Sequence, residues 1–129
     1  MTMRLLSFGP EWGTPIREYR SHQASAVTLG SGQGEGHIYC VHLAAGGEIG
    51  AHEAGFAQLF LVVAGSGWVS GPDGVRETLS EGQGAFITRG ELHAKGSASG
   101  LTAIMVQLTE LTAGGGVPGE PRRESEQGA

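Results

Sequence analysis

Short apolar runs separated by glycine are the feature of this sequence that most restricts its fold. Each run has the length and composition of a β-strand, and no stretch of ten or more residues carries the 3.6-residue stripe of an amphipathic helix. The runs cover residues 26–29, 37–43, 57–63, 67–70, 75–79, 85–88 and 101–108. The 24 glycines among 129 residues have no collagen-like period and suit tight turns between strands. We therefore predict an all-β sandwich or barrel.

One turn is chemically specific. Gly71-Pro72-Asp73-Gly74 separates two strand-like runs, with a proline that presets φ and a glycine that can take a positive φ. We predict a β-hairpin over residues 68–79.

The length allows one domain with one hydrophobic core. Residues 1–25 are expected to form an irregular N-terminal arm because glycine and proline interrupt every pattern there. The β-barrel is expected over residues 26–111. Residues 112–129 have almost no apolar side chains and are expected to be a disordered tail.

Charge and hydropathy exclude several classes of function. The formal net charge is −5 and the eight basic residues are scattered, so we expect no nucleic-acid partner. There is no apolar stretch of membrane-spanning length and no signal-peptide pattern, so we expect no membrane association and a cytoplasmic location. The one cysteine, Cys40, is expected to be a buried apolar thiol, and the one lysine, Lys95, suggests no mechanism from its sequence context.

A polar residue enters a strand that is apolar on both faces. Gln58, Phe60 and Val62 share one face of the run 57–63, because alternate side chains of a strand point the same way. Gln58 therefore faces either a barrel lumen or, as an end-of-strand residue, the surface. The five histidines form no His-x-His or His-x3-His pair, so local spacing alone does not indicate a metal site.

Two sequence motifs narrow the choice. The first reads Gly46-x5-His52-x-Ala54-x3-Gln58-x6-Gly65. This spacing resembles the first motif of the cupins, G-x5-H-x-H-x3,4-E-x6-G, with Ala54 in place of the second histidine and Gln58 in place of the glutamate.

The second motif reads Gly82-x5-Thr88-x-Gly90-x2-His93-x3-Ser97. It is similar to the second cupin motif, G-x5-P-x-G-x2-H-x3-N, with Thr88 and Ser97 at the proline and asparagine positions. The short inter-motif stretch, 66–81, is like that of small bacterial cupins.

The resemblance covers residues 29–108 and is to the RmlC-like cupin superfamily, in particular to stand-alone bacterial cupins of unassigned function. It implies a double-stranded β-helix, or jelly roll, that is a homodimer with its ligand inside the barrel. Carried over by position, it makes His52, Gln58 and His93 the expected metal-binding residues. Phe60 and Trp68 are further candidates because aromatic rings can stack on a ligand, although core packing is the alternative for both.

Three hypotheses of function remain open at this point. In one, the chain is a small-molecule-binding cupin and a metal-dependent enzyme on a sugar or small oxygenated metabolite. Two imidazoles and a neutral amide favour zinc, nickel or copper over magnesium or calcium. In another, the site is degenerate and metal-free, and the chain is a non-catalytic ligand-binding or sensor cupin. A third hypothesis is a dimerisation module that uses the outer apolar face of Leu59, Leu61 and Val63.

Overall fold

The computed structural model describes residues 3–114 and consists of β-strands with two short 3₁₀ turns. The strands are β1 (Arg4–Ser7), β2 (Thr14–Pro15), β3 (Ser25–Ala26), β4 (Gly30–Leu43), β5 (Glu48–Glu53), β6 (Ala57–Ser70), β7 (Arg76–Ser80), β8 (Gln83–Ile87), β9 (Leu92–Gly96) and β10 (Leu101–Ala113).

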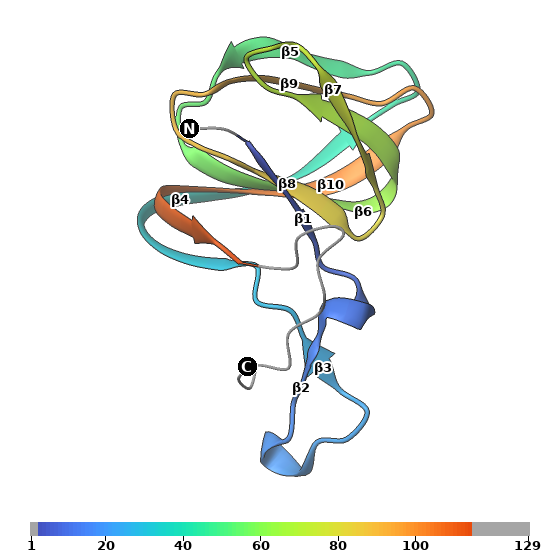
Figure 1. Cartoon of the computed structure of the whole chain (residues 1–129), viewed down its shortest axis with the longest axis vertical. Coiled ribbons are helices and arrows are strands. Elements are labelled where there is room, and N and C mark those ends of the chain that lie inside the picture. The colour runs from blue at the N-terminus through green and yellow to red at the C-terminus, as the bar shows by residue number, and fades with distance from the viewer. Residues whose placement is uncertain (1–2, 115–129) are drawn as a thin grey trace.

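Two antiparallel layers face one another (Figure 1). One has the strand order β1-β8-β6-β10-β4, and the other is formed by β5, β9 and β7 with the second half of β6. The long strand β6 therefore belongs to both layers and turns the chain from one to the other. The prediction of a jelly roll is confirmed, and so is the hairpin over 68–79, in which Trp68 pairs with Thr78 and Ser70 with Arg76.

A β-bulge at Val63 changes which side chains of β6 point inward. Ala103 of β10 pairs with Val62, whereas the preceding Thr102 pairs with Ala64, so Val63 is the extra residue. Before the bulge the even-numbered Phe60 and Val62 lie in the core. Beyond it the inward residue is odd-numbered, since Val69 is fully buried in the same core.

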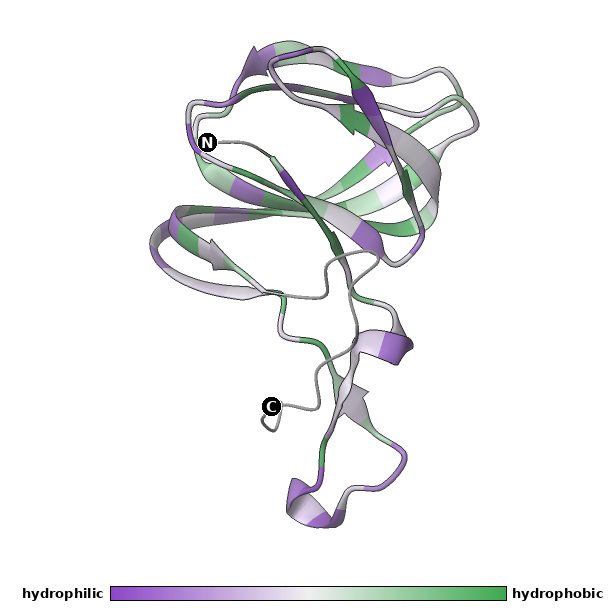
Figure 2. Ribbon diagram, in the orientation of Figure 1, coloured by the Kyte–Doolittle hydropathy of each residue, from purple (hydrophilic) through white to green (hydrophobic). Residues whose placement is uncertain are grey.

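The main core lies between the layers, and apolar segments are concentrated in the strands of these layers (Figure 2). A second, smaller cluster lies on the outer side of β6, where Leu6 of β1 covers Leu59 and Leu61. These two leucines are 3% and 4% exposed. The outer face proposed as a dimerisation surface is thus covered by the chain's own β1, and only Val63 of that set is exposed, at 42%.

The glycines of both motifs have a structural reason. Gly46, Gly65, Gly82 and Gly90 all have φ between 80° and 85°, in the left-handed region that glycine enters without strain. At Gly65 a Cβ would also overlap the carbonyl oxygen of Gly100. The motif glycines therefore mark turns between strands at Gly46, Gly82 and Gly90, and at Gly65 the point where β6 passes from pairing with β10 to pairing with β7.

The structure differs from the sequence-based expectations in several places. Within the expected irregular arm, β1 joins the main sheet beside β8, while β2 and β3 pair into a hairpin that projects away from the two layers (Figure 1). The boundary expected at residue 112 falls inside β10, and the rest of the expected disordered tail, 115–129, lies outside the described residues. Cys40 is exposed on β4, so the prediction of a buried thiol is wrong.

Candidate functional site

Two histidines from different strands meet at one end of the space between the layers. His52 of β5 pairs with His93 of β9 in the antiparallel register, and their ring centroids are 4.5 Å apart. His93 is 1% exposed, whereas His52 is exposed. His52 therefore lies at the rim of the interior and His93 inside it.

Backbone hydrogen bonds set the tautomer of both rings. Nδ1–H of His52 donates to the carbonyl oxygen of Gly50 at 2.8 Å, and Nδ1–H of His93 donates to that of Glu91 at 3.2 Å. A carbonyl only accepts, so in the neutral rings both Nε2 atoms are acceptors. Nε2 of His93 is buried and has no hydrogen-bond partner within residues 3–114.

Gln58 and Phe60 of β6 share the inward face. Gln58 is 2% exposed and its Oε1 is the other buried side-chain polar atom without a partner in the described chain. Phe60 is fully buried in the main core. The buried side chains of Gln58, Phe60, His93 and Lys95 are together called the lumen below.

Lys95 is the lumen residue that the sequence did not reveal. It follows His93 by two residues on β9 and shares its face, is 1% exposed, and places Nζ 5.1 Å from the ring centroid of Phe60. A cation at this distance from an aromatic face is attracted by the ring quadrupole. The lumen thus holds one cation above an aromatic ring.

Burial lowers the pKa of both ionisable lumen groups. The pKa of Lys95 falls from its ordinary 10.5 to about 8 because burial penalises the ammonium form. The pKa of His93 falls from 6.5 to about 4, first through burial and then through the charge of Lys95, with His52 adding to the effect. At neutral pH His93 is a neutral acceptor and Lys95 is mostly a cation.

Trp68 is not brought to the lumen. It follows the bulge of β6 and neighbours the inward Val69, so its ring lies on the outer side, 3.8 Å from the guanidinium carbon of Arg76. A Cβ on Gly96 would overlap the same ring. Trp68 therefore packs on β9 from outside, which supports the packing alternative for this residue over the ligand-stacking one.

The substituted motif positions have structural roles. Thr88 donates both its N–H and its Oγ1–H to Oε1 of Glu91, at 3.1 and 3.0 Å, and the N–H of Met3 donates to Oε2 at 2.6 Å. Oγ of Ser97 donates to the carbonyl oxygen of Ser66 and accepts from the N–H of Gly100. The Glu91 carboxylate is thereby held between β1 and the turn before β9.

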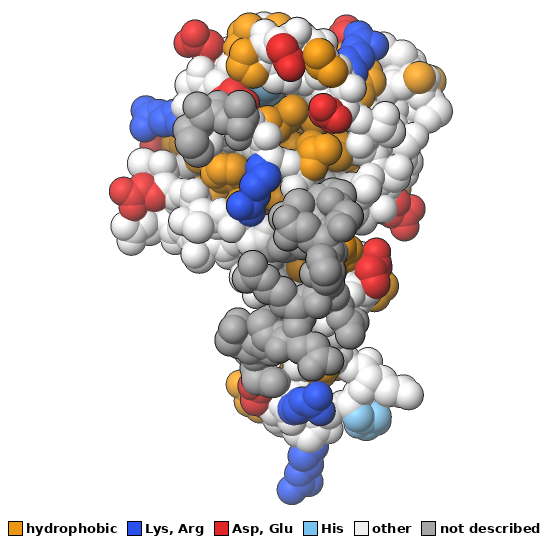
Figure 3. Space-filling model, viewed as in Figure 1, with side chains coloured by type: hydrophobic (Ala, Val, Ile, Leu, Met, Phe, Trp, Pro, Cys, Tyr) orange, Lys and Arg blue, Asp and Glu red, His pale blue; other side chains and the backbone are white. Residues whose placement is uncertain are grey.

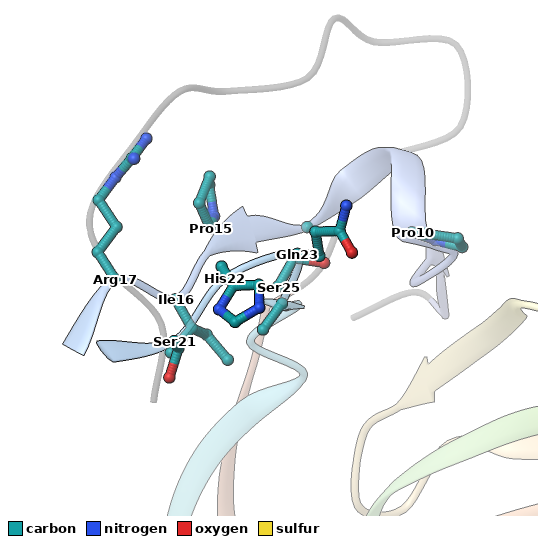
Figure 4. Close-up of a pocket in the computed structure, with 10 residues that line it drawn as sticks. Pro10, Pro15, Ile16, Arg17, Ser21, His22, Gln23 and Ser25 are labelled. Atoms are coloured by element: carbon teal, nitrogen blue, oxygen red, sulfur yellow. The ribbon is translucent and has the colours of Figure 1, made fainter. Parts of the chain in front are cut away.

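Two hollows are lined by residues other than Gln58, Phe60, His93 and Lys95. One, of about 520 Å³, lies at the β2–β3 hairpin, and its lining includes Arg17, His22 and Gln23 (Figure 4). A second, of about 360 Å³, lies between β1 and the β6–β7 turn and includes Glu91. Neither contains the motif histidines.

Charged side chains of both signs are scattered over the face of the molecule shown in Figure 3. On the face in Figure 3 the Lys and Arg side chains over the two layers stand apart from one another, among carboxylates. Within residues 3–114 no helix is long and apolar enough to cross a membrane.

The lumen residues do not fit a resident divalent metal ion. The two Nε2 atoms and Oε1 of Gln58 are suitable donors, but Ala54, 4% exposed, replaces the further ligand. Nowhere in residues 3–114 do three His, Cys, Asp or Glu side chains cluster for a metal. A divalent ion would add to the Lys95 charge with no carboxylate in the lumen to balance it, which the low dielectric of the interior makes costly.

Comparison with solved structures gives the class of protein. The chain matches a cupin superfamily protein from Desulfitobacterium hafniense with a TM-score of 0.54 and 16% identity, over 62% of this chain and 75% of that one. It also matches an RmlC-like cupin from Shewanella frigidimarina with a TM-score of 0.53 and 25% identity, over 57% and 65% of the two chains. The chain has the cupin fold, a double-stranded β-helix.

The neighbours include bacterial proteins without an assigned reaction. A conserved protein of unknown function from Streptococcus pyogenes matches with a TM-score of 0.54 and 21% identity, over 59% of this chain and 66% of that one. The resemblance to stand-alone bacterial cupins is thus confirmed at the level of structure. No family model and no curated protein matches this chain.

Proposed function

We propose that this chain is a cupin that binds a small polar organic molecule in its lumen without a metal ion. The observation that carries the proposal is the pair of buried polar atoms without a partner, Nε2 of His93 and Oε1 of Gln58. A buried polar atom left unpaired costs about 1–3 kcal/mol, and a ligand hydroxyl would satisfy each one. Apolar walls with a few convergent polar groups are typical of small-molecule sites.

The competing proposal is a metal-dependent enzyme with His52, Gln58 and His93 as ligands. The orientation of both imidazoles by backbone carbonyls favours it, because metal-bound histidines are usually held in this way. The buried ammonium of Lys95 argues against it. The charge argument is the stronger, since a hydrogen bond to Nδ1 orients a ring equally well for an organic ligand.

The test begins with protein purified without a histidine tag. Metal analysis and titration with Zn²⁺, Ni²⁺ and Cu²⁺ should give no stoichiometric binding and no rise in the melting temperature. A stoichiometric ion that stabilises wild type and is lost in His93→Gln would overturn the metal-free proposal.

Ligand-detected NMR with a collection of small hydroxylated molecules then tests the lumen itself. Binding should be lost in Gln58→Leu and His93→Gln. The matched control is Trp68→Leu, which alters a large aromatic side chain outside the lumen and should leave binding unchanged. Ligands whose binding ignores Gln58 and His93 would place the site elsewhere.

A further inference from the structure

The lumen contains a cation without a counter-ion in the described chain. Lys95 is 1% exposed. The side-chain ion pairs found in residues 3–114 are His37 with Glu35 and Arg76 with Glu48, both on the surface. The Lys95 ammonium donates no hydrogen bond to any described residue. Its one identified attractive interaction within residues 3–114 is the cation–π contact with the ring of Phe60.

The carboxylate of Glu91, on the segment before β9, already has hydrogen-bond partners. Glu91 precedes His93 by two residues, but its two oxygens accept from Met3 and Thr88. A cation–π contact compensates a buried ammonium by only about 1–2 kcal/mol, whereas the desolvation penalty of an ion is several kcal/mol. The remaining charge is best balanced by an anion that is not among the described residues 3–114.

The two unpaired polar atoms of the lumen are hydrogen-bond acceptors, whereas Lys95 is a donor. Nε2 of His93 and Oε1 of Gln58 are acceptors and need donors. One cationic donor and one neutral acceptor on β9, with a second neutral acceptor on the first half of β6 in the other layer, describe a ligand with one negative group and adjacent hydroxyl groups. Carboxylate is the anion that fits, because a dianion such as phosphate would leave its second charge uncompensated beside a single lysine.

We propose that the lumen binds a small hydroxycarboxylic acid, whose carboxylate pairs with Lys95 and whose hydroxyl groups donate to Nε2 of His93 and Oε1 of Gln58. This inference rests on the proposed function, since it names the ligand class of the same site. The titratable groups around Lys95 are His93 on the same strand, His52 and Glu91 beside the His93 ring, and the exposed Glu77, which is separated from Lys95 in the sheet by Val69. None of them forms an ion pair with the ammonium in the described residues.

The chain offers an unusually direct test because Lys95 is its only lysine. Protein labelled with ¹³C at lysine Cε gives one side-chain signal, which reports on the lumen without assignment. The probes are glycolate, lactate and glycerate at millimolar concentration. The controls are glyceramide, which keeps the hydroxyls but is neutral, acetate, which has no hydroxyl, and inorganic phosphate.

We expect at least one hydroxy acid to shift the Lys95 signal saturably, with acetate, phosphate and glyceramide binding more weakly. A charge-assisted hydrogen bond contributes roughly 1.5–3 kcal/mol, so Lys95→Met should weaken binding of the acid roughly tenfold or more. In Lys95→Met the acid and its amide should bind alike.

Three results would overturn the inference: no shift with any hydroxy acid, equal affinity of the acid for wild type and Lys95→Met, or tighter binding of phosphate than of the acids. The proposed function fails separately. If neutral hydroxylated ligands still depend on Gln58 and His93 while the acids do not bind, only the ligand class is wrong. If no ligand depends on those two residues, the lumen site itself is wrong.

Discussion

Replacing the buried lysine by an apolar side chain of similar length should stabilise this protein. In the folded chain the Lys95 pKa is about 8, against 10.5 for an exposed lysine. At roughly 1.4 kcal/mol per pKa unit, this difference corresponds to about 3 kcal/mol of destabilisation by the buried ammonium. Lys95→Met removes the charge and keeps most of the packing, so the free energy of unfolding at pH 7 should rise by about that amount.

The pH dependence identifies the cause. Below pH 8 the amine is protonated in both folded and unfolded wild type, and the penalty is fully present. Between pH 8 and 10.5 the unfolded chain binds more protons than the folded one, so the stability of wild type rises with pH. Lys95→Met lacks this rise, and its advantage over wild type should shrink steadily across that interval.

Urea unfolding followed by tryptophan fluorescence measures both effects. The matched control is Arg89→Met, which removes a cation from an exposed position and should change stability by less than about 0.5 kcal/mol. A destabilised Lys95→Met at pH 7, or an advantage that is the same at pH 7 and pH 10, would refute the reasoning that Lys95 is an uncompensated buried charge.

Three further predictions concern the residues around the lumen. The pKa of His93 is about 4 in the folded chain and 6.5 when exposed, so the unfolded chain binds the proton first as the pH falls. Between pH 6.5 and 4 the free energy of unfolding of wild type should therefore fall by about 3 kcal/mol relative to that of His93→Gln. The same pH dependence of urea unfolding in both proteins would contradict this. Leu6 is fully buried against the outer side of β6, so Leu6→Ala should lower the free energy of urea unfolding by about 2–5 kcal/mol. Its lumen residues are unchanged, so ligand affinity should equal that of wild type. Gly96→Ala should cost about 1–3 kcal/mol, because its Cβ overlaps the Trp68 ring, and Trp68→Ala in the same chain should relieve much of that penalty in a double-mutant cycle.

The fold was predictable from the sequence because most strands carry a run of apolar side chains and are separated by glycine-rich turns. The strands β5 and β9 were not predicted. Both carry polar side chains toward the lumen or solvent, His52 on one and His93 with Lys95 on the other, so neither has an apolar run to recognise. The strands that contain the candidate site were thus the ones that a hydrophobic pattern could not find.

The places of two side chains could be assigned only from the three-dimensional structure. Trp68 shares the parity of Gln58 and Phe60 in the sequence, but the bulge at Val63 reverses the inward face before Trp68 is reached. Lys95 was passed over because a lone lysine is normally solvated, and nothing local marks it as buried. The expected homodimer, the metal-free ligand site and the cytoplasmic location stay predictions.

The bulge in β6 also bears on how cupin sequences should be aligned. The interval between Gln58 and Gly65 contains a residue that belongs to neither pleat phase of the strand. A one-residue gap in that interval would exchange the inward and outward positions of the following hairpin. The inward Val69 would then be aligned with outward positions of the relatives, and the outward Trp68 with inward ones. Alignments of distant relatives should therefore hold this interval at fixed length and take their gaps in the turn after Ser70 instead.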